Sequence, residues 1–450
     1  MPSWPNGGRH ASRLHKATIL TTIDFSITGL ASNGRGVAEH DGATWFVDDA
    51  LPGEMVRATV ADKRRRVRRA KTIITLEASP DRVAPRCEYF GVCGGCVMQH
   101  LSISGQLRHK QANVVAALER HSVTLGVDRI TGISPSAWGY RRKGRLGVRY
   151  VPKKGGILVG FREREKNYVT DMNQCHTLVP ELSSLIPSLK AQLQDISGRE
   201  SIPQIEVASG INVAAIVVRH LTSCSERDLQ QLTSFGRQQN VRVYLQSGGP
   251  DTIVPLEKRG EPLTYRIRAS GDTIEFLATD FIQVNDAANQ EIVDSVLHML
   301  ALTQADHVLE LFCGLGNLTL PVASNVERVV GLDYDEQLVR RAKDNALFNH
   351  KDNVEFIRAD LTEAPVGEWS TSERFTKLLL DPPRSGALEI LSTIVPTLAP
   401  ERIVYVSCNP ETLARDAATL TARFGYRLEA IQVVDMFAHT GHVETIALFV

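Results

Sequence analysis

The sequence predicts an α/β protein in which a parallel-sheet domain follows a small β-barrel and a mixed α+β region. Two apolar runs near the C-terminal end, one before Asp381 and one before Cys408, each stop at a polar tip and continue into a helical pattern. A strand, a glycine-rich turn and a second strand span residues 307–333. Residues 17–77 instead hold short β-like runs between glycine-rich turns. Because open α/β sheets bind ligands at the carboxyl ends of their strands, we expect the chemistry at those polar tips.

Length and composition are those of a globular chain with several domains. At 450 residues the chain is too long for one core. Its formal net charge is zero, so any nucleic-acid affinity must come from local patches. The first twenty residues contain no apolar signal core and precede no membrane-length run, which predicts a cytoplasmic protein. The expected divisions are a disordered tail at 1–12, a barrel at 13–78, a central region at 79–279 and the parallel-sheet domain at 280–450.

The region from Ala17 to Glu77 favours a small closed barrel. The spacing of residues 29–54 resembles the TRAM domain, an oligonucleotide-binding-type barrel attached to RNA-modifying enzymes. The run from Lys63 to Lys71 has seven positive side chains and no acid. Such a run suits a phosphate backbone, although it also suits a strand edge protected by charge. The absence of acids favours RNA.

Three cysteines, Cys87, Cys93 and Cys96, form a C-x5-C-x2-C pattern, and Cys175 is the nearest candidate for a fourth ligand. Four thiolates serve a structural zinc or an iron-sulfur cluster equally well. The spacing resembles the [4Fe-4S] site of bacterial ribosomal RNA uracil-5-methyltransferases, which implies a [4Fe-4S] cluster. Cys224 has no neighbouring ligand pattern.

A helical period covers residues 101–125, and a mixed region of strands follows to about residue 279. Within that region, residues 138–162 interleave aromatic side chains with cations. This mixture suits stacking on unpaired bases and contact with phosphates. It also suits the exposed face of any sheet, so both interpretations stay open.

The strand and turn at 307–317 and a second strand ending in Asp333 predict a nucleotide-binding unit. Glycines let the backbone approach a ligand, and an acid at the end of the second strand can hold ribose hydroxyls. Thr319 occupies the place of the third glycine of the dinucleotide fingerprint, which disfavours a dinucleotide.

The turn at residues 309–323 resembles motif I of class I (Rossmann-like) S-adenosylmethionine-dependent methyltransferases. This resemblance implies S-adenosyl-L-methionine as the cofactor. It further implies that Phe312 and Asn317 line the cofactor pocket, that Asp333 holds the ribose and that Asp360 meets the adenine.

Cys408 is the candidate nucleophile, because a thiolate can add to C6 of a pyrimidine and so activate C5. Asn409 is expected as a helix N-cap and Pro410 as the first helical residue, which puts the thiol at a helix N-terminus. We expect the helix dipole to lower the thiol pKa, with Glu411 slightly opposing it. The alternative is a buried cysteine at a strand end. Asp381 is expected to accept a hydrogen bond from N3 of the base, or else to cap its turn.

Glu444 is the candidate general base, since it lies at the start of the final strand. His439 and His442 are close to it in the sequence. A zinc site from these three residues is conceivable, but no compact motif such as H-E-x-x-H is present.

The segments DPPRSG, VYVSCNPETLARD and DMFAHTGHVE together resemble the RNA uracil-5-methyltransferase family, and the resemblance covers nearly the whole chain. It implies that Cys408 is the nucleophile, Glu444 the general base, Gln283 a cofactor-site and substrate-site residue, and Asp381 a uracil contact at the cofactor site. It also implies that part of residues 100–130 packs on the catalytic domain.

A barrel together with a cluster implies the branch that makes 5-methyluridine in 23S ribosomal RNA, in a single-stranded or remodelled loop. A transfer RNA target is the alternative, and a monomer is expected. A methylthiolating radical enzyme would need C-x3-C-x2-C with one open iron. The alternative from a different functional class is a non-catalytic iron-sulfur module that binds RNA or senses redox state.

Overall fold

The computed structural model describes residues 21–62, 68–257, 262–361 and 374–450. The expected tail at 1–12 and the first part of the basic run, Lys63–Val67, lie outside these residues. The chain divides into two compact units at Pro80, and each is described by itself. No helix among the described residues is long and apolar enough to cross a membrane.

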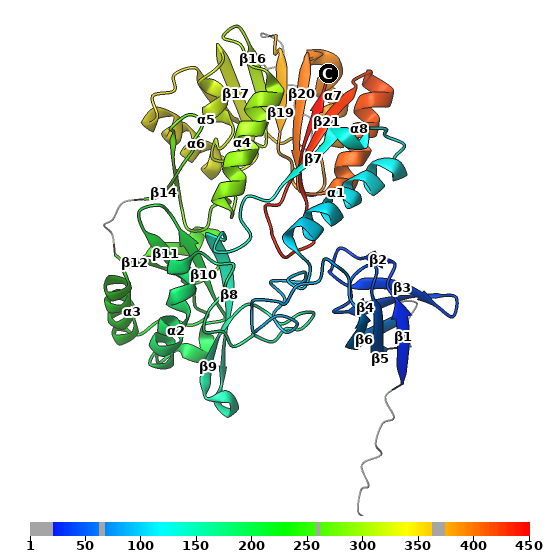
Figure 1. Ribbon diagram of the computed structural model, residues 1–450. Helices are drawn as coiled ribbons and strands as arrows, with labels where there is room; N and C mark the ends of the chain where they lie inside the picture. Colours follow the sequence, from blue (N-terminus) through cyan, green and yellow to red (C-terminus); the bar gives the residue numbers. More distant parts are fainter. Residues whose placement is uncertain (1–20, 63–67, 258–261, 362–373) are drawn as a thin grey trace, which may run out of the picture. The chain divides into compact units, whose positions relative to one another are not determined.

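The first unit is a six-stranded barrel (Figure 1). Its sheet has the order β1-β5-β6-β4-β3-β2. The edge strands β1 and β2 are joined by Ile27 and Thr28, whose amides donate to the carbonyls of Glu54 and Val37. The segment 22–30 thus forms hydrogen bonds with both ends of the sheet and closes it into a barrel, as predicted. The strands are β1 (Thr22–Ser26), β2 (Gly29–Leu30), β3 (Gly36–His40), β4 (Ala43–Asp48), β5 (Met55–Asp62) and β6 (Arg68–Glu77).

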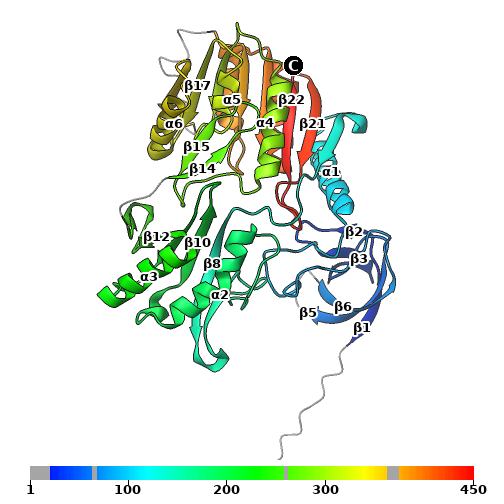
Figure 2. The same cartoon turned by 60° about the vertical axis from the view of Figure 1, so that its left-hand side comes forward.

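The second unit begins with an irregular segment: between Asp81 and Ser102 the chain forms no helix and only isolated bridges. A six-stranded central sheet of order β13-β12-β11-β10-β8-β9 follows later in the chain. Helices α2 (Pro180–Gln194) and α3 (Glu226–Gln239) cover one face of it (Figure 2). The strands are β8 (Lys143–Val151), β9 (Gly156–Gly160), β10 (Gln204–Ser209), β11 (Ala214–Arg219), β12 (Val241–Gln246) and β13 (Ile253–Pro255); β14 (Leu263–Arg266) and β15 (Thr273–Phe276) form a separate hairpin.

An eight-stranded sheet of order β18-β17-β16-β19-β20-β22-β21-β7 forms the rest of the unit. The neighbours from β18 to β20 pair in parallel, whereas β22 is antiparallel to both of its neighbours. The apolar runs of the parallel strands fit burial on both faces. The strands are β7 (Ile130–Ile133), β16 (His307–Leu311), β17 (Arg328–Asp333), β18 (Val354–Arg358), β19 (Lys377–Leu380), β20 (Arg402–Ser407), β21 (Leu428–Val434) and β22 (Glu444–Phe449).

Side chains alternate between two hydrophobic cores, one on each face of this sheet. One core contains residues of α4 (Asp286–Leu300), α5 (Thr319–Ala323) and α6 (Glu336–Phe348) and continues into the central sheet. The other contains residues of α1 (Ile103–Arg120), α7 (Leu388–Leu398) and α8 (Pro410–Phe424). Helices on both faces of a mostly parallel sheet confirm the predicted α/β fold class.

Residues 103–133 belong to the flank of this sheet. Helix α1 packs in the same core as α8, and β7 pairs in parallel with β21, so that Ile130 lies opposite Ile431. A segment that precedes the central sheet in the chain thus forms the edge strand of the eight-stranded sheet.

Candidate active site and four-cysteine site

The three residues expected to carry the chemistry lie at one edge of the eight-stranded sheet. Asp381 follows the end of β19, and Cys408 follows the end of β20. Because β22 is antiparallel, its first residue, Glu444, lies at the same edge, and the next residue, Thr445, pairs with Ser407. The amide of Asp381 donates to the carbonyl of Leu311, at the end of β16, over 3.3 Å. The strand order therefore brings thiol and carboxyl groups to one place.

Cys408 stands before α8, as predicted. Asn409 is the N-cap, and its Oδ1 accepts a hydrogen bond from the amide of Glu411 over 3.2 Å. Its Nδ2 donates to the carbonyl of Arg384 over 2.9 Å, which ties the cap to the turn after β19. The thiol is neither fully buried nor fully exposed. The cap thus fixes the direction in which the nucleophile leaves the strand.

The expectation that the pKa of the Cys408 thiol is lowered is wrong. Burial, followed by the charges of Glu444 and Asp381, raises the pKa of Cys408, while Arg384 only partly offsets this. The side chain of Glu411 forms an ion pair with Arg120 on the surface. Burial, with the two carboxyl groups from other strands adding to it, therefore keeps the thiol protonated despite its place at a helix N-terminus.

The two carboxyl groups are also shifted. Burial raises the pKa of Asp381 to about 7. Burial and then the charge of Asp381 raise the pKa of Glu444 well above its usual value, against the effect of Arg384. Nη2 of Arg384 lies 3.2 Å from Nδ1 of His442. This contact joins the turn after β19 to the segment that precedes Glu444. Two acids with raised pKa values beside a thiol are suited to proton transfer near neutral pH.

The turn after β16 has the backbone of a cofactor-binding loop. Phe312, with φ 62°, lies in the left-handed region that side chains other than glycine rarely adopt. Gly316, with φ 87°, lies so close to the ring of Phe356 that an added Cβ would approach it to 3.1 Å. The amide of Gly314 donates to Oδ2 of Asp333 over 2.9 Å, which joins the loop to the end of β17. Strain held in this way is common where backbone must approach a ligand.

The remaining expected cofactor residues lie around this turn. Asp360 follows β18, and the neighbouring amide of Ala359 donates to the carbonyl of Asp333. The side-chain amides of Asn317 and Asn289, which lies on α4, donate to each other's Oδ1, each over 2.9 Å. Oδ1 of Asn317 also accepts a hydrogen bond from the hydroxyl of Tyr265. Asn317 therefore anchors the turn to α4.

Gln283 lies just before α4 and is partly exposed. Its carbonyl accepts a hydrogen bond from Nε of Arg142 over 2.9 Å. The guanidinium of Arg142 also lies 4.4 Å from the ring centroid of Tyr265 and pairs with Asp286. A buried arginine thus fixes the backbone that presents Gln283.

Glu310 is a candidate functional residue that sequence reasoning missed. It is buried in β16, and its Oε2 has no hydrogen-bond partner among the described residues. Burial, with the charges of Asp381 and Asp333, raises its pKa to about 8. The sequence signal that could have identified it is an acid inside an otherwise apolar run, two residues before Phe312.

The four expected metal ligands come together. Cys87, Cys93, Cys96 and Cys175 line one cavity of about 120 Å³. Burial raises the pKa of Cys93 to about 11 and that of Cys96 to about 12, and the neighbouring cysteines add to both shifts. Such thiols need a cation to become thiolates.

The cavity at the cysteines has room for more than one water molecule. Among the described residues, no group of three or more His, Cys, Asp or Glu side chains has the geometry of a metal-ion site. A water molecule needs only about 10–15 Å³ of such space, whereas the cavity has about 120 Å³. Four cysteine thiols around one cavity are a donor set that fits an iron-sulfur cluster and also fits a zinc ion.

His439 does not have the free nitrogen that a zinc site with Glu444 would require. Its Nδ1 lies 3.2 Å from Nε2 of Gln106, and its Nε2 lies 3.0 Å from the carbonyl oxygen of Ala137. Burial lowers its pKa to about 4, so the ring is neutral. Both nitrogens are committed to protein partners, which leaves His439 a structural role.

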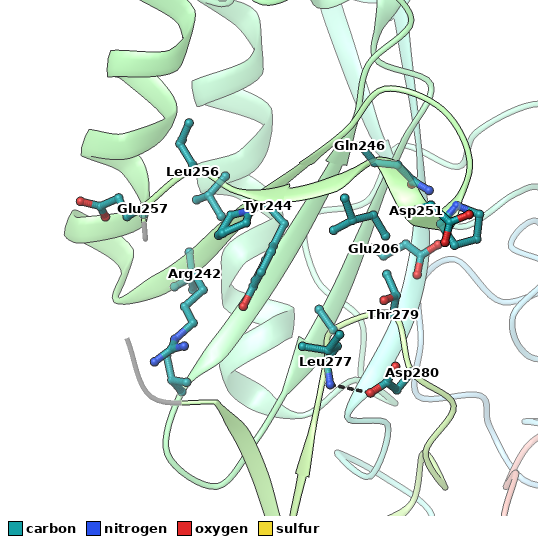
Figure 3. Close-up of a pocket in the computed structure, with 18 of the residues that line it drawn as sticks. Glu206, Arg242, Tyr244, Gln246, Asp251, Leu256, Glu257, Leu277, Thr279 and Asp280 are labelled. Atoms are coloured by element: carbon teal, nitrogen blue, oxygen red, sulfur yellow. Dashed lines mark hydrogen bonds between the residues drawn. The ribbon is translucent and has the colours of Figure 1, made fainter. Parts of the chain in front are cut away.

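A separate cleft of about 1080 Å³ lies between β12 of the central sheet and residues Leu277 to Asp280 (Figure 3). Three of its arginines, Arg145, Arg237 and Arg341, are paired with Glu206, Glu257 and Asp280. Its charges are thus largely balanced. Neither Cys408 nor Glu444 lines it, and we assign no chemistry to it.

Comparisons with known proteins cover nearly the whole chain. A family model described as tRNA (Uracil-5-)-methyltransferase matches residues 158–450, and a TRAM domain model matches residues 16–73. A protein of Xanthomonas oryzae pv. oryzae (strain MAFF 311018) named "23S rRNA (uracil(1939)-C(5))-methyltransferase RlmD" is 45% identical over 432 residues, covering 95% of this chain and 97% of the relative. A protein of the same name from Alkalilimnicola ehrlichii is 44% identical over 445 residues, covering 98% of each chain.

Among solved structures, the tRNA (uracil-54, C5)-methyltransferase of Pyrococcus abyssi, in complex with S-adenosyl-L-homocysteine, matches with a TM-score of 0.73. It is 23% identical and covers 95% of this chain and 100% of that chain. At this level of identity the likeness supports the fold.

Proposed function

The chain belongs to the RNA uracil-5-methyltransferase family, and from this premise we propose that it methylates C5 of a uracil in 23S ribosomal RNA. The observation that carries the proposal is the meeting of Cys408, Asp381 and Glu444 at one sheet edge, beside the turn after β16. A thiol for addition, a carboxyl for orientation and a carboxyl for proton removal are the groups that the reaction needs.

The turn after β16 suits S-adenosyl-L-methionine. We assign the ribose to Asp333, the adenine to Asp360 and the pocket walls to Phe312 and Asn317, with Gln283 and Asp381 at the methyl end. Glu310, with its unpartnered Oε2, is suited to a positively charged part of the cofactor. When bound, the cofactor supplies an electrophilic methyl group.

In the proposed reaction, Cys408 loses its proton and its sulfur adds to C6 of the uracil. The electron pair of the C5–C6 double bond then forms the bond to the methyl group at C5, and the pair of the broken methyl–sulfur bond would stay on the cofactor sulfur as a neutral thioether. Asp381 accepts a hydrogen bond from N3 and holds the base in register. Glu444 removes the remaining proton from C5, the double bond re-forms, and the thiolate of Cys408 leaves. Because the resting thiol has a raised pKa, its proton must leave through the neighbouring acids to solvent when the substrate binds, so that Glu444 is again without a proton for the C5 step.

We further propose that Cys87, Cys93, Cys96 and Cys175 hold a [4Fe-4S] cluster. Four cysteines around one cavity support this ligand set and leave no iron open for radical cleavage of the cofactor. Iron and acid-labile sulfide in equal amounts are expected in anaerobically purified protein. Zinc without sulfide would contradict the assignment.

For the RNA target, the TRAM match and the names of the relatives favour 23S ribosomal RNA. The target base must leave its stack to reach Cys408, which favours an unpaired or remodelled loop. We propose a monomeric, cytoplasmic enzyme divided into a barrel at 13–78, a central region at 79–279 and a catalytic domain at 280–450. Transfer RNA is the competing substrate, because the family model carries that description.

The test uses RNA tritiated at uridine C5. Wild-type protein with cofactor should release tritium, Cys408→Ala should not, and cofactor binding should survive the change. Cys224→Ala, at a half-buried thiol outside both sites, is the matched control. Turnover retained by Cys408→Ala would remove the mechanism, and no release by wild type would favour a non-catalytic RNA-binding module. Loss of 5-methyluridine from 23S RNA in a deletion strain separates the ribosomal from the transfer RNA target.

A further inference from the structure

The loop between β21 and β22, residues 435–443, runs directly into Glu444 and is bonded to the cysteine-bearing segment. The amides of Val97 and Met98, which follow Cys96, both donate to the carbonyl oxygen of His439, over 2.8 and 3.0 Å. One carbonyl of the loop thus receives two hydrogen bonds from residues adjacent to a proposed metal ligand. The position of Cys96 and the position of the loop are therefore linked.

A second link runs through the wall of the cysteine cavity. Tyr140 lines the cavity and is buried, and its hydroxyl donates to the carbonyl of Ala438 in the loop over 3.0 Å. Tyr89 lines the same cavity, but its hydroxyl accepts from the amide of Asn173 in the central region over 3.1 Å. The two tyrosines are therefore a matched pair for experiment, since one hydroxyl bonds the loop and the other does not.

Trp138 supplies a third set of links. Its ring centroid lies 4.0 Å from that of His439, with the planes 36° apart. The ring of His176, which follows Cys175, meets the edge of Trp138 at 6.3 Å. The guanidinium of Arg86, which precedes Cys87, lies 5.3 Å from the Trp138 centroid. Neighbours of both the first and the last cysteine thus reach the loop through one indole ring.

The cysteine-bearing segment has little regular secondary structure of its own. Between Asp81 and Ser102 it has no helix and only isolated bridges. Metal binding in such segments contributes folding free energy directly, because the ligands are tied together only when the metal is present. Cys408, in contrast, is carried by β20 and α8, whose strand pairing and cap lie within the catalytic sheet domain.

We propose that the filled cysteine site holds the loop 435–443, and with it Glu444, in the position for removing the C5 proton, with Trp138, Tyr140 and His439 as positioning residues. The proposal rests on the proposed function, in which Glu444 is the base and the cysteines hold a cluster. The rate of the elimination step should therefore depend on whether the cysteine site is filled. The rate at which Cys408 adds to the base should depend on it less.

The first test measures hydrogen exchange of peptides covering residues 435–444 in the full-length, cluster-loaded protein. Removing the cluster from wild type should speed exchange in these peptides about tenfold, as expected for losing one buried hydrogen bond. Tyr140→Phe should do the same with the cluster in place, whereas Tyr89→Phe should not. Unchanged exchange in the cluster-free protein, or equal effects of the two tyrosine variants, would overturn the proposal.

The second test follows the covalent complex between protein and RNA. In Trp138→Leu the visible absorption of the cluster should remain, because Trp138 does not line the cavity. Its elimination step should slow about tenfold, so that the methylated adduct accumulates and kcat falls more than KM rises. Trp138→Phe keeps an aromatic ring and should restore turnover. A lower rate without adduct accumulation would contradict a positioning role.

The role of Glu444 and its coupling to the cysteine site can be disproved separately. If Glu444→Gln traps an adduct but the loop does not respond to cluster removal, the proposed chemistry stands and the coupling is wrong. If Glu444→Gln traps no adduct, the assignment of Glu444 as the base is wrong. The proposed coupling of the cysteine site to catalysis is then wrong too, even if the hydrogen exchange of the loop responds to cluster removal.

Discussion

The charge of Asp381 raises the pKa of Glu444, and burial raises the pKa of both acids. The two residues come from strands β19 and β22, which are separated in the sheet by β20. A carboxyl pair buried in this way resists double ionisation, so one member keeps its proton at a pH where isolated acids have lost it.

Asp381→Asn should therefore move the elimination step to lower pH. Elimination needs Glu444 without its proton, and removing the neighbouring negative charge lowers the pKa of Glu444. The acid limb of the rate of adduct breakdown should shift downward in pH, although the rate at the plateau falls if N3 is held less well. Single-turnover measurements across pH give both quantities. Glu411→Gln, an acid already paired with Arg120 on the surface, should leave the limb in place.

Two substitutions should change the Cys408 thiol in opposite directions. Glu444 raises the pKa of Cys408 and Arg384 lowers it. Alkylation by iodoacetamide requires the thiolate. At neutral pH the alkylation of Cys408 should be faster in Glu444→Gln and slower in Arg384→Gln than in wild type. Peptide mass spectrometry against pH measures this without substrate, and a shift of the same sign in both variants would refute the electrostatic account.

The strand ends could be predicted from the sequence, since the apolar runs before Asp381 and Cys408 end abruptly in polar residues. The N-cap at Asn409 and the start of α8 at Pro410 followed from local chemistry, and the structure confirms both. Local patterns succeed where the deciding contacts lie within one turn of the helix.

The thiol pKa could not be predicted, because it depends first on burial and then on the charges of Glu444 and Asp381, which tertiary packing brings to Cys408. The same holds for the Trp138 and His439 stack, whose partners lie about 300 residues apart in the sequence. The strand β7 could not be predicted from the sequence either, because its four residues form a strand only by pairing with β21 in the folded protein.

Glu310→Gln should stabilise the protein and weaken cofactor binding. The pKa of Glu310 rises from 4.5 to about 8 on folding. The unfolded chain therefore loses this proton first, and the contribution of Glu310 to stability falls as pH rises from about 4.5 to about 8. At 1.36 kcal/mol per unit, its removal should add about 3 kcal/mol at pH 7. Denaturant unfolding at pH 5 and pH 7 tests this, because the gain should be much smaller at pH 5.

Glu355→Gln is the control for the Glu310 substitution. Glu355 is an exposed acid paired with Arg328, so its loss should change stability by less than about 1 kcal/mol at either pH. A gain in Glu310→Gln that is equal at pH 5 and pH 7 would mean that packing, rather than the buried charge, sets the effect.

Lys110→Met should cost more stability than any exposed ion pair of the same helix. Nζ of Lys110 lies 2.5 Å from Oδ1 of Asp435, both side chains are fully buried, and Nζ also donates to the carbonyl of Phe437. Removing the cation leaves a buried carboxylate without its partner, at a cost of about 3–5 kcal/mol. Arg120→Met, at the C-terminal end of α1, breaks an exposed pair with Glu411 and should cost only about 0–1 kcal/mol. Denaturant unfolding of both variants gives the difference, and equal losses would show that the buried pair contributes no more than a surface one.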